Sequence, residues 1–164
     1  MYKRQDPAGR ATYRRNAARY MRRLRALDRS IAACIDEIPP ARRKLVTSHD
    51  ALGYYARRYG LQVIGALIPS LSTNAQSSAR DIERLVSQIE RERVEAVFPE
   101  SSLTPKLERA VSRETGARVG KALWADSLGP KGSSGATYLG SLKANTAALV
   151  SGLSGGRVSC TPRG

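Results

Sequence analysis

Histidine and cysteine, two side chains that often bind transition metals, are scarce in this sequence: one histidine and two cysteines occur in 164 residues. A structural zinc module draws its four ligands from several such residues, and a disulfide framework needs several cysteine pairs. The sequence therefore excludes a cysteine-rich zinc module and a disulfide-stapled fold. We expect Cys34 and Cys160 to be separate free thiols.

Segments typical of a membrane span or an active site are also missing. The longest apolar runs, such as residues 61–71, are too short and too interrupted to cross a bilayer, and no signal-type segment opens the chain. The glycine-rich stretch 129–135 lacks the Gly-Lys-Ser/Thr of a phosphate-binding loop, which favours a mobile surface loop. Ser48, His49 and Asp50 are triad residue types, but adjacent residues cannot form a relay. We therefore do not expect an enzyme.

Acidic residues are few relative to basic ones, with 14 Asp and Glu against 28 Lys and Arg and a net charge of +14. The excess is concentrated in residues 1–44, which hold 13 basic and 4 acidic side chains. Such a charge, taken alone, is typical of proteins that bind nucleic acids or anionic surfaces. With 41% apolar residues, the chain can nevertheless build a hydrophobic core.

The basic segment carries the pattern of one long helix. Apolar residues recur at steps of four and three, at positions Tyr13, Ala17, Tyr20, Leu24, Leu27, Ile31, Cys34 and Ile38. Asp6-Pro7 is a start signal and Pro39-Pro40 a stop signal, so we expect a helix over residues 6–38, about 45 Å long. The arginines spread around the remaining surface, which favours a solvated outer face. A basic nucleic-acid-binding helix is the alternative.

Beyond the helix, short β-prone runs alternate with helical patterns. The pattern predicts strands over residues 44–48, 61–66, 94–98 and 117–123, and helices over 49–59, 77–93, 104–115 and 137–153. This alternation predicts an α/β fold: a roughly four-stranded parallel sheet flanked by helices and preceded by the long helix. Residues 154–164 have no periodicity, and we expect a flexible tail there.

Candidate ligands follow the predicted strands, where open α/β sheets bind their ligands. His49 and Asp126 would make half of a zinc or manganese site, and Glu100 and Asp50 would orient the ligands from the surrounding shell. The alternatives are that His49 caps a helix, that Asp126 is an ordinary turn residue and that Glu100 is a solvated loop residue. Two ligands do not complete a zinc site, so the others would come from elsewhere.

Several motifs together resemble one family. The residues that carry the resemblance are 44–56 (KLVTSHDALGYYA), 59–61 (YGL), 98–102 (FPESS), 114–116 (ETG), 126–129 (DSLG), 137–139 (TYL) and Asn145. In this order and spacing they resemble the C-terminal lobe of the zinc/manganese-type solute-binding proteins of ABC importers. Residues 6–38 are similar to the long helix that links the two lobes of those proteins. The resemblance covers residues 6–153.

The resemblance implies a function and a set of partners. It implies that residues 41–153 are the C-terminal metal-binding lobe, with His49 and Asp126 as its two ligands and zinc favoured over manganese. The metal would be captured outside the cytoplasm, in the periplasm or by a surface lipoprotein, and delivered to an ABC permease in the membrane. The resemblance implies neither a nucleic-acid partner nor a small-molecule substrate other than the metal ion.

The resemblance also implies that this chain lacks the N-terminal lobe, which brings the other ligands, and the signal sequence. The first five residues, Met-Tyr-Lys-Arg-Gln, resemble the translation of a transposon sequencing adapter. We therefore expect residues 1–5 to be foreign to the natural protein.

Overall fold

The computed structural model describes residues 2–68 and 78–164, and for residues 2 and 3 the backbone only. The elements in chain order are α1 (Tyr2–Gln5), α2 (Arg10–Asp36), the 3-10 turn η1 (Pro40–Arg42), β1 (Lys44–His49), α3 (Gly53–Tyr59), β2 (Gln62–Ile68), α4 (Ala79–Glu92), β3 (Ala96–Phe98), α5 (Lys106–Thr115), β4 (Arg118–Val119) and α6 (Tyr138–Leu153). Position 77 of the predicted helix 77–93 lies outside the described residues.

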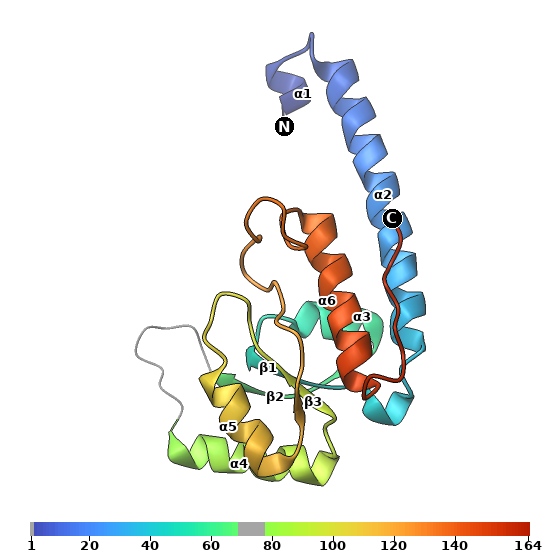
Figure 1. Cartoon of the computed structure of the whole chain (residues 1–164). Helices are drawn as coiled ribbons and strands as arrows, with labels where there is room; N and C mark the ends of the chain where they lie inside the picture. The colour runs from blue at the N-terminus through green and yellow to red at the C-terminus, as the bar shows by residue number, and fades with distance from the viewer. Residues whose placement is uncertain (1, 69–77) are drawn as a thin grey trace.

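The strands form one parallel sheet in the order β2-β1-β3-β4. Helices α4 and α5 pack on one face, whereas α3 and α6 cover the other and α2 packs against them (Figure 1). Successive side chains of β3 point to opposite faces of the sheet. Ala96 and Phe98 therefore lie in the core under α2 and α6, and Val97 lies in the core under α4 and α5. The predicted α/β class with a parallel sheet is confirmed.

Several element boundaries differ from the sequence prediction, and two of them lie near the candidate site. His49 is the last residue of β1 and not the first of a helix, because a turn separates it from α3, which begins at Gly53. The fourth strand is limited to Arg118–Val119 instead of 117–123. It lies at the sheet edge with a single neighbour, and pairing returns only as an isolated bridge between Glu100 and Leu123. In the described ranges, no helix has the length and apolar composition needed to cross a bilayer.

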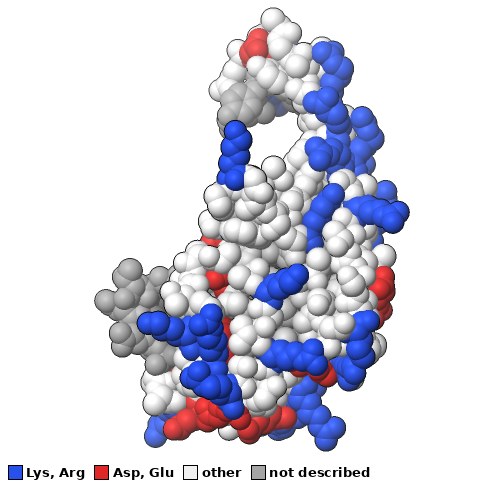
Figure 2. Space-filling model, in the orientation of Figure 1, with Lys and Arg blue, Asp and Glu red and all other residues white. Residues whose placement is uncertain are grey.

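Helix α2 is only partly covered by the rest of the chain. Its C-terminal half buries Leu27, Ile31, Cys34 and Ile35, while its N-terminal half projects beyond the sheet (Figure 1). Tyr20, on the same stripe, is 42% exposed. The arginines of this half are all exposed, and Figure 2 shows basic side chains along the projecting part.

The start of α2 also differs from the prediction. Helical geometry begins at Arg10, and Asp6 is not the residue before the first turn. Instead, the Asp6 carboxylate accepts hydrogen bonds from the Gly9 N–H at 3.0 Å and the Tyr13 hydroxyl at 2.7 Å. The bond from Gly9, followed by that from Tyr13, holds the pKa of Asp6 below its usual range. Asp6 therefore closes the turn that precedes the helix.

The last residues of the chain lie along α2, in contrast to the expected flexible tail. A disulfide joins Cys34 in α2 to Cys160, which corrects the expectation of two free thiols. The Arg163 N–H donates to Ser30 Oγ at 2.8 Å, and Lys143 Nζ donates to the Gly164 carbonyl at 2.6 Å. The tail lacks periodicity because its backbone bonds to neighbouring elements and not within a helix or strand.

An ion pair connects α2 to α3. Arg58 donates two hydrogen bonds to Asp28, Nη2 to Oδ2 at 2.7 Å and Nε to Oδ1 at 3.1 Å, and the Tyr59 hydroxyl donates to Oδ1 at 3.0 Å. The hydrogen bond from Arg58, and secondarily that from Tyr59, lowers the pKa of Asp28. A carboxyl with a depressed pKa stabilises the fold above its unfolded-state pKa and loses that contribution as the pH falls through its folded-state pKa.

We therefore expect Asp28→Asn to reduce the melting temperature at about pH 6, where the carboxyl is ionised in both states. The reduction should shrink as the pH falls below about 4 and through the folded-state pKa of Asp28, because the wild-type carboxyl then becomes protonated. Differential scanning calorimetry of both proteins across this pH range measures the difference. A difference in melting temperature that does not change with pH would contradict the assignment of the stabilisation to the Asp28 carboxylate.

Candidate metal centre

The register of the sheet brings His49 and Glu100 together. β1 and β3 are parallel neighbours in which Thr47 pairs with Phe98, so the residues two positions further along, His49 and Glu100, lie opposite each other at the carboxyl edge. Both are buried, each 6% exposed. His49 and Glu100 thus become neighbours because β1 and the chain that follows β3 run in the same direction beyond the last pair of the β1–β3 ladder.

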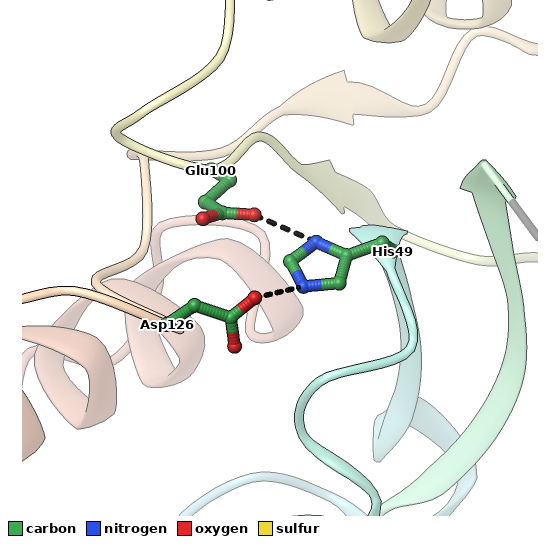
Figure 3. Close-up of side chains that lie close together, drawn as sticks. All are labelled: His49, Glu100 and Asp126. Atoms are coloured by element: carbon green, nitrogen blue, oxygen red, sulfur yellow. Dashed lines mark hydrogen bonds and ion pairs between the residues drawn. The ribbon is translucent and has the colours of Figure 1, made fainter. Parts of the chain in front are cut away.

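Asp126 approaches the same histidine from the loop that follows β4. Figure 3 shows the imidazole between the two carboxylates, with Nδ1 2.6 Å from Glu100 Oε2 and Nε2 2.8 Å from Asp126 Oδ2. One potential ligand atom from each of the three residues lies within 4.8 Å of the others. The side chain of Asp126 is 50% exposed, so the centre is open to solvent on that side. The two predicted ligands lie together at one sheet edge.

The arrangement around the ring suits a cation at Nε2. Nε2 and Asp126 Oδ2 lie at hydrogen-bond distance, and which ring nitrogen carries the proton of a neutral imidazole depends on the tautomer. In the tautomer with the proton on Nδ1, the lone pair of Nε2 faces the carboxylate of Asp126. Two acceptors at this separation repel unless a proton or a metal ion lies between them. In many metal sites, the ring nitrogen of histidine that does not bind the metal donates its N–H to a carboxylate, which fixes the orientation of the ring.

The remaining predictions for this edge have different outcomes. Glu100 is not a solvated loop residue, since its Oε1 accepts a hydrogen bond from Ser102 Oγ at 2.6 Å and its Oε2 contacts the ring. The helix-capping alternative for His49 is wrong, because the residue before α3 is Leu52. Asp50 is exposed and lies outside the three-residue cluster.

Asn145 fixes the chain that leads into Asp126. Its side-chain amide, buried in α6, accepts from the Trp124 N–H through Oδ1 and donates to the Trp124 carbonyl through Nδ2, both at 2.8 Å. The sequence offered Asn145 only as part of a family resemblance. Helix α6 also carries Ser141, Lys143 and Thr146, so the sequence held no separate signal for this backbone clamp.

The glycine-rich loop packs around the same tryptophan. A Cβ at Gly135 would lie 2.3 Å from the Trp124 ring, so only glycine allows the backbone this close. The Gly129 N–H donates to the Gly135 carbonyl at 2.8 Å, and Trp124 Nε1 donates to Ser134 Oγ at 3.2 Å. The loop expected to be a mobile surface segment instead closes on itself over Trp124, two residues before Asp126.

We expect Asn145→Ala to weaken zinc binding by about tenfold or more, in the range found when residues behind a metal ligand are removed. The substitution leaves the Trp124 N–H and C=O without their partners and frees the backbone next to Asp126. Competition titration with a chromophoric chelator measures the affinity. Thr146→Ser, one position further along α6, keeps the hydroxyl that bonds to Tyr55 and serves as the control. Unchanged affinity in Asn145→Ala would contradict the clamp.

A cavity of about 250 Å³ opens next to Asp126. Its walls include Tyr55, Trp124 and Tyr138 as well as Asp126. The carboxylate is therefore reachable from outside the chain.

Comparisons with known proteins identify the family of the chain. Residues 2–152 match the family described as zinc-uptake complex component A, periplasmic. The chain is 35% identical over 146 residues to the manganese-binding lipoprotein MntA of Bacillus subtilis, which is 86% of this chain and 47% of the relative. It is 34% identical over 139 residues to the zinc-binding protein TroA of Treponema pallidum, 82% of this chain and 44% of TroA.

Solved structures show the same fold. The periplasmic zinc-binding protein TroA of Treponema pallidum superposes with a TM-score of 0.84 at 30% identity, over 93% of this chain and 56% of TroA. A manganese-bound periplasmic metal-binding protein of Candidatus Liberibacter asiaticus has a TM-score of 0.83 at 24% identity, over 93% and 56% of the two chains. The chain spans about half the length of the relatives it matches. By its sequence and its fold, it belongs to the family of periplasmic zinc-uptake complex component A proteins.

Proposed function

We propose that this chain is the metal-binding lobe, with its linking helix, of the substrate-binding component of an ABC metal importer. The observation that carries the proposal is the position of the His49 ring, whose Nε2 lies 2.8 Å from Asp126 Oδ2 while its Nδ1 lies 2.6 Å from Glu100 Oε2. His49 and Asp126 are the proposed ligands, and Glu100 orients His49. Residues 6–38 are the proposed linking helix and 41–153 the proposed lobe.

Zinc is the favoured metal and manganese the second candidate. Imidazole suits zinc, and at a given site with nitrogen and oxygen ligands zinc binds more tightly than manganese. Carboxylates, which outnumber the imidazole in this cluster, also suit manganese. The relatives bear names for both metals, and a further one, YfeA of Yersinia pestis, is named an iron-binding protein.

The proposed role is capture and delivery of the ion, which is cargo and not the cofactor of a reaction. The ion would be held in a cleft between this lobe and a second lobe and then passed to a permease in the membrane. The exposed stripe of α2 supports a second lobe, because Tyr13 and Tyr20 are 40% and 42% exposed in the chain described here. None of the relatives reported above is named for nucleic-acid binding.

The proposed location is extracytoplasmic, either periplasmic or on a surface lipoprotein. The names of the family and of the MntA relative support it. The disulfide between Cys34 and Cys160 supports it independently, because disulfides persist in oxidising compartments and are rare in the cytosol.

Isothermal titration of the chain with zinc and with manganese tests this function. We expect one zinc ion per chain, bound more tightly than manganese and more weakly than nanomolar, because the two proposed ligands, His49 and Asp126, are about half of the four that a zinc site usually has. Asp126→Asn should weaken zinc binding, since the amide is a neutral and poorer ligand. Absence of zinc binding, or binding that is the same in Asp126→Asn, would contradict the proposal.

A further inference from the structure

Another carboxylate, Glu108, lies behind the metal centre without belonging to the ligand cluster. It is 3% exposed and sits in the first turn of α5, at the same edge of the sheet as His49. Glu108 and Val111 are the buried residues of this helix, and Leu107 and Val111 pack in the apolar core on this side of the sheet. Burial of a carboxylate is costly unless other groups bind it, so the partners of Glu108 determine what it does.

Glu108 acts on the centre through one hydroxyl group. Its Oε1 accepts a hydrogen bond from Ser48 Oγ at 2.5 Å, and Ser48 Oγ accepts one from the Glu100 backbone N–H at 2.9 Å. A serine hydroxyl has a single proton, so donation to Glu108 leaves its lone pairs free for the Glu100 N–H. Glu108 thus determines which way the hydroxyl points.

This chain of hydrogen bonds connects the two residues that hold the imidazole. Ser48 precedes His49 in β1, and Glu100 contacts His49 Nδ1. A hydroxyl held by Glu108 therefore fixes the backbone of Glu100 relative to the backbone of His49. The second carboxylate oxygen, Oε2, has no hydrogen-bond partner among the described residues, so the Ser48 contact is the polar interaction through which Glu108 acts.

We infer that Glu108 is a positioning residue of the metal centre: by orienting the Ser48 hydroxyl, it keeps Glu100 against Nδ1 and so keeps Nε2 directed at the metal. This inference rests on the proposed function. It predicts that removal of the Glu108 carboxylate disturbs the ring of His49 and lowers metal affinity, although Glu108 itself touches no metal.

The sharpest variant is Glu108→Leu, which removes the acceptor and the buried charge together. Replacement of a buried charge by an apolar side chain of similar size is often neutral or stabilising, so the fold should be retained. Zinc affinity should nevertheless fall by about 10–100-fold, the usual effect of losing a residue that orients a ligand. A merely structural residue would not give unchanged stability together with weaker binding.

Two further variants complete the set. Glu108→Gln keeps an oxygen acceptor for Ser48 and should retain the zinc affinity of the wild type. Glu114→Ala removes an exposed carboxylate from the same helix and controls for the loss of negative charge. Circular dichroism and urea unfolding report whether each variant folds.

The single histidine allows a direct readout of the ring. In a metal-free 1H–15N NMR spectrum of the imidazole, every signal comes from His49. We expect one tautomer with the proton on Nδ1 in the wild type, Glu108→Gln and Glu114→Ala, and a mixture of tautomers in Glu108→Leu. Zinc titration of the same samples gives the affinities.

The outcomes separate this inference from the proposed function. Wild-type ring signals and wild-type zinc affinity in Glu108→Leu would overturn the inference and leave the proposed function intact. Loss of folding in Glu108→Leu would assign a structural role to Glu108 and overturn the inference as well, unless a folded Glu108→Met shows the expected loss of affinity. If the wild type binds no zinc, the proposed function fails, and the metal-free ring signals still decide whether Glu108 positions His49.

Discussion

Replacement of His49 by alanine is expected to weaken zinc binding by at least about 100-fold, because even residues behind a metal ligand contribute 10–100-fold to affinity. His49 provides the only imidazole in the chain, and its Nε2 is the atom that faces Asp126. Without it, the half-exposed Asp126 and the buried Glu100 would be the remaining carboxylates of the cluster. Competition with a chromophoric chelator over a range of zinc concentrations measures the change.

Asp50→Ala is the matched control for this prediction. Asp50 directly follows His49 and is also acidic, but it is exposed and lies outside the cluster. We expect its replacement to change zinc affinity by less than about twofold, in the range of a surface charge. An equal loss in both variants would indicate that zinc binds to the general negative charge of this edge and not to a site centred on His49.

Reduction of the disulfide is expected to lower the free energy of unfolding by about 2–5 kcal/mol. Cys34 and Cys160 are 126 positions apart, so the bond closes residues 34–160 into one long loop and restricts the unfolded state strongly. It also holds the last residues against α2, where the Arg163 N–H donates to Ser30 Oγ. Urea unfolding with and without a reductant measures the difference.

The double variant Cys34→Ser/Cys160→Ser is the control for the reductant itself. Its unfolding midpoint should match that of the reduced wild type and should not respond to the reductant. Thiol labelling of the untreated protein provides a second check, since both cysteines should be unreactive. Two reactive thiols in the native protein, or identical midpoints with and without reductant, would contradict the bond.

The position of the candidate metal centre could be predicted from the sequence because it depends on local patterns. Alternating strands and helices predict a parallel sheet, and a parallel sheet gathers the residues after its strands at one edge. His49 and Asp126 were found in this way, although neither their contact nor its distance follows from the pattern. The order of the strands determines this contact and its distance, and the register of β1 against β3 places Glu100 opposite His49.

Features that depend on packing between distant parts of the sequence could not be predicted from local patterns. The Cys34–Cys160 bond forms because the last residues of the chain lie along α2. A segment without periodicity does not predict where it will lie. The sequence does not mark Glu108 as a site residue, because a glutamate in the first turn of a helix is common and interacts favourably with the helix dipole. Its position on the same face as Val111 was the available sign of burial, and its partner Ser48 lies 60 positions away.

The position of a bound zinc ion would show whether this edge of the sheet is the metal centre. Crystals of the chain soaked in zinc, with anomalous diffraction data collected at the zinc absorption edge, would locate the ion independently of any assumed ligand. We predict a peak about 2.0–2.2 Å from both His49 Nε2 and a carboxylate oxygen of Asp126, with Glu100 still at Nδ1. A peak elsewhere on the chain, or none near His49, would contradict the proposed site.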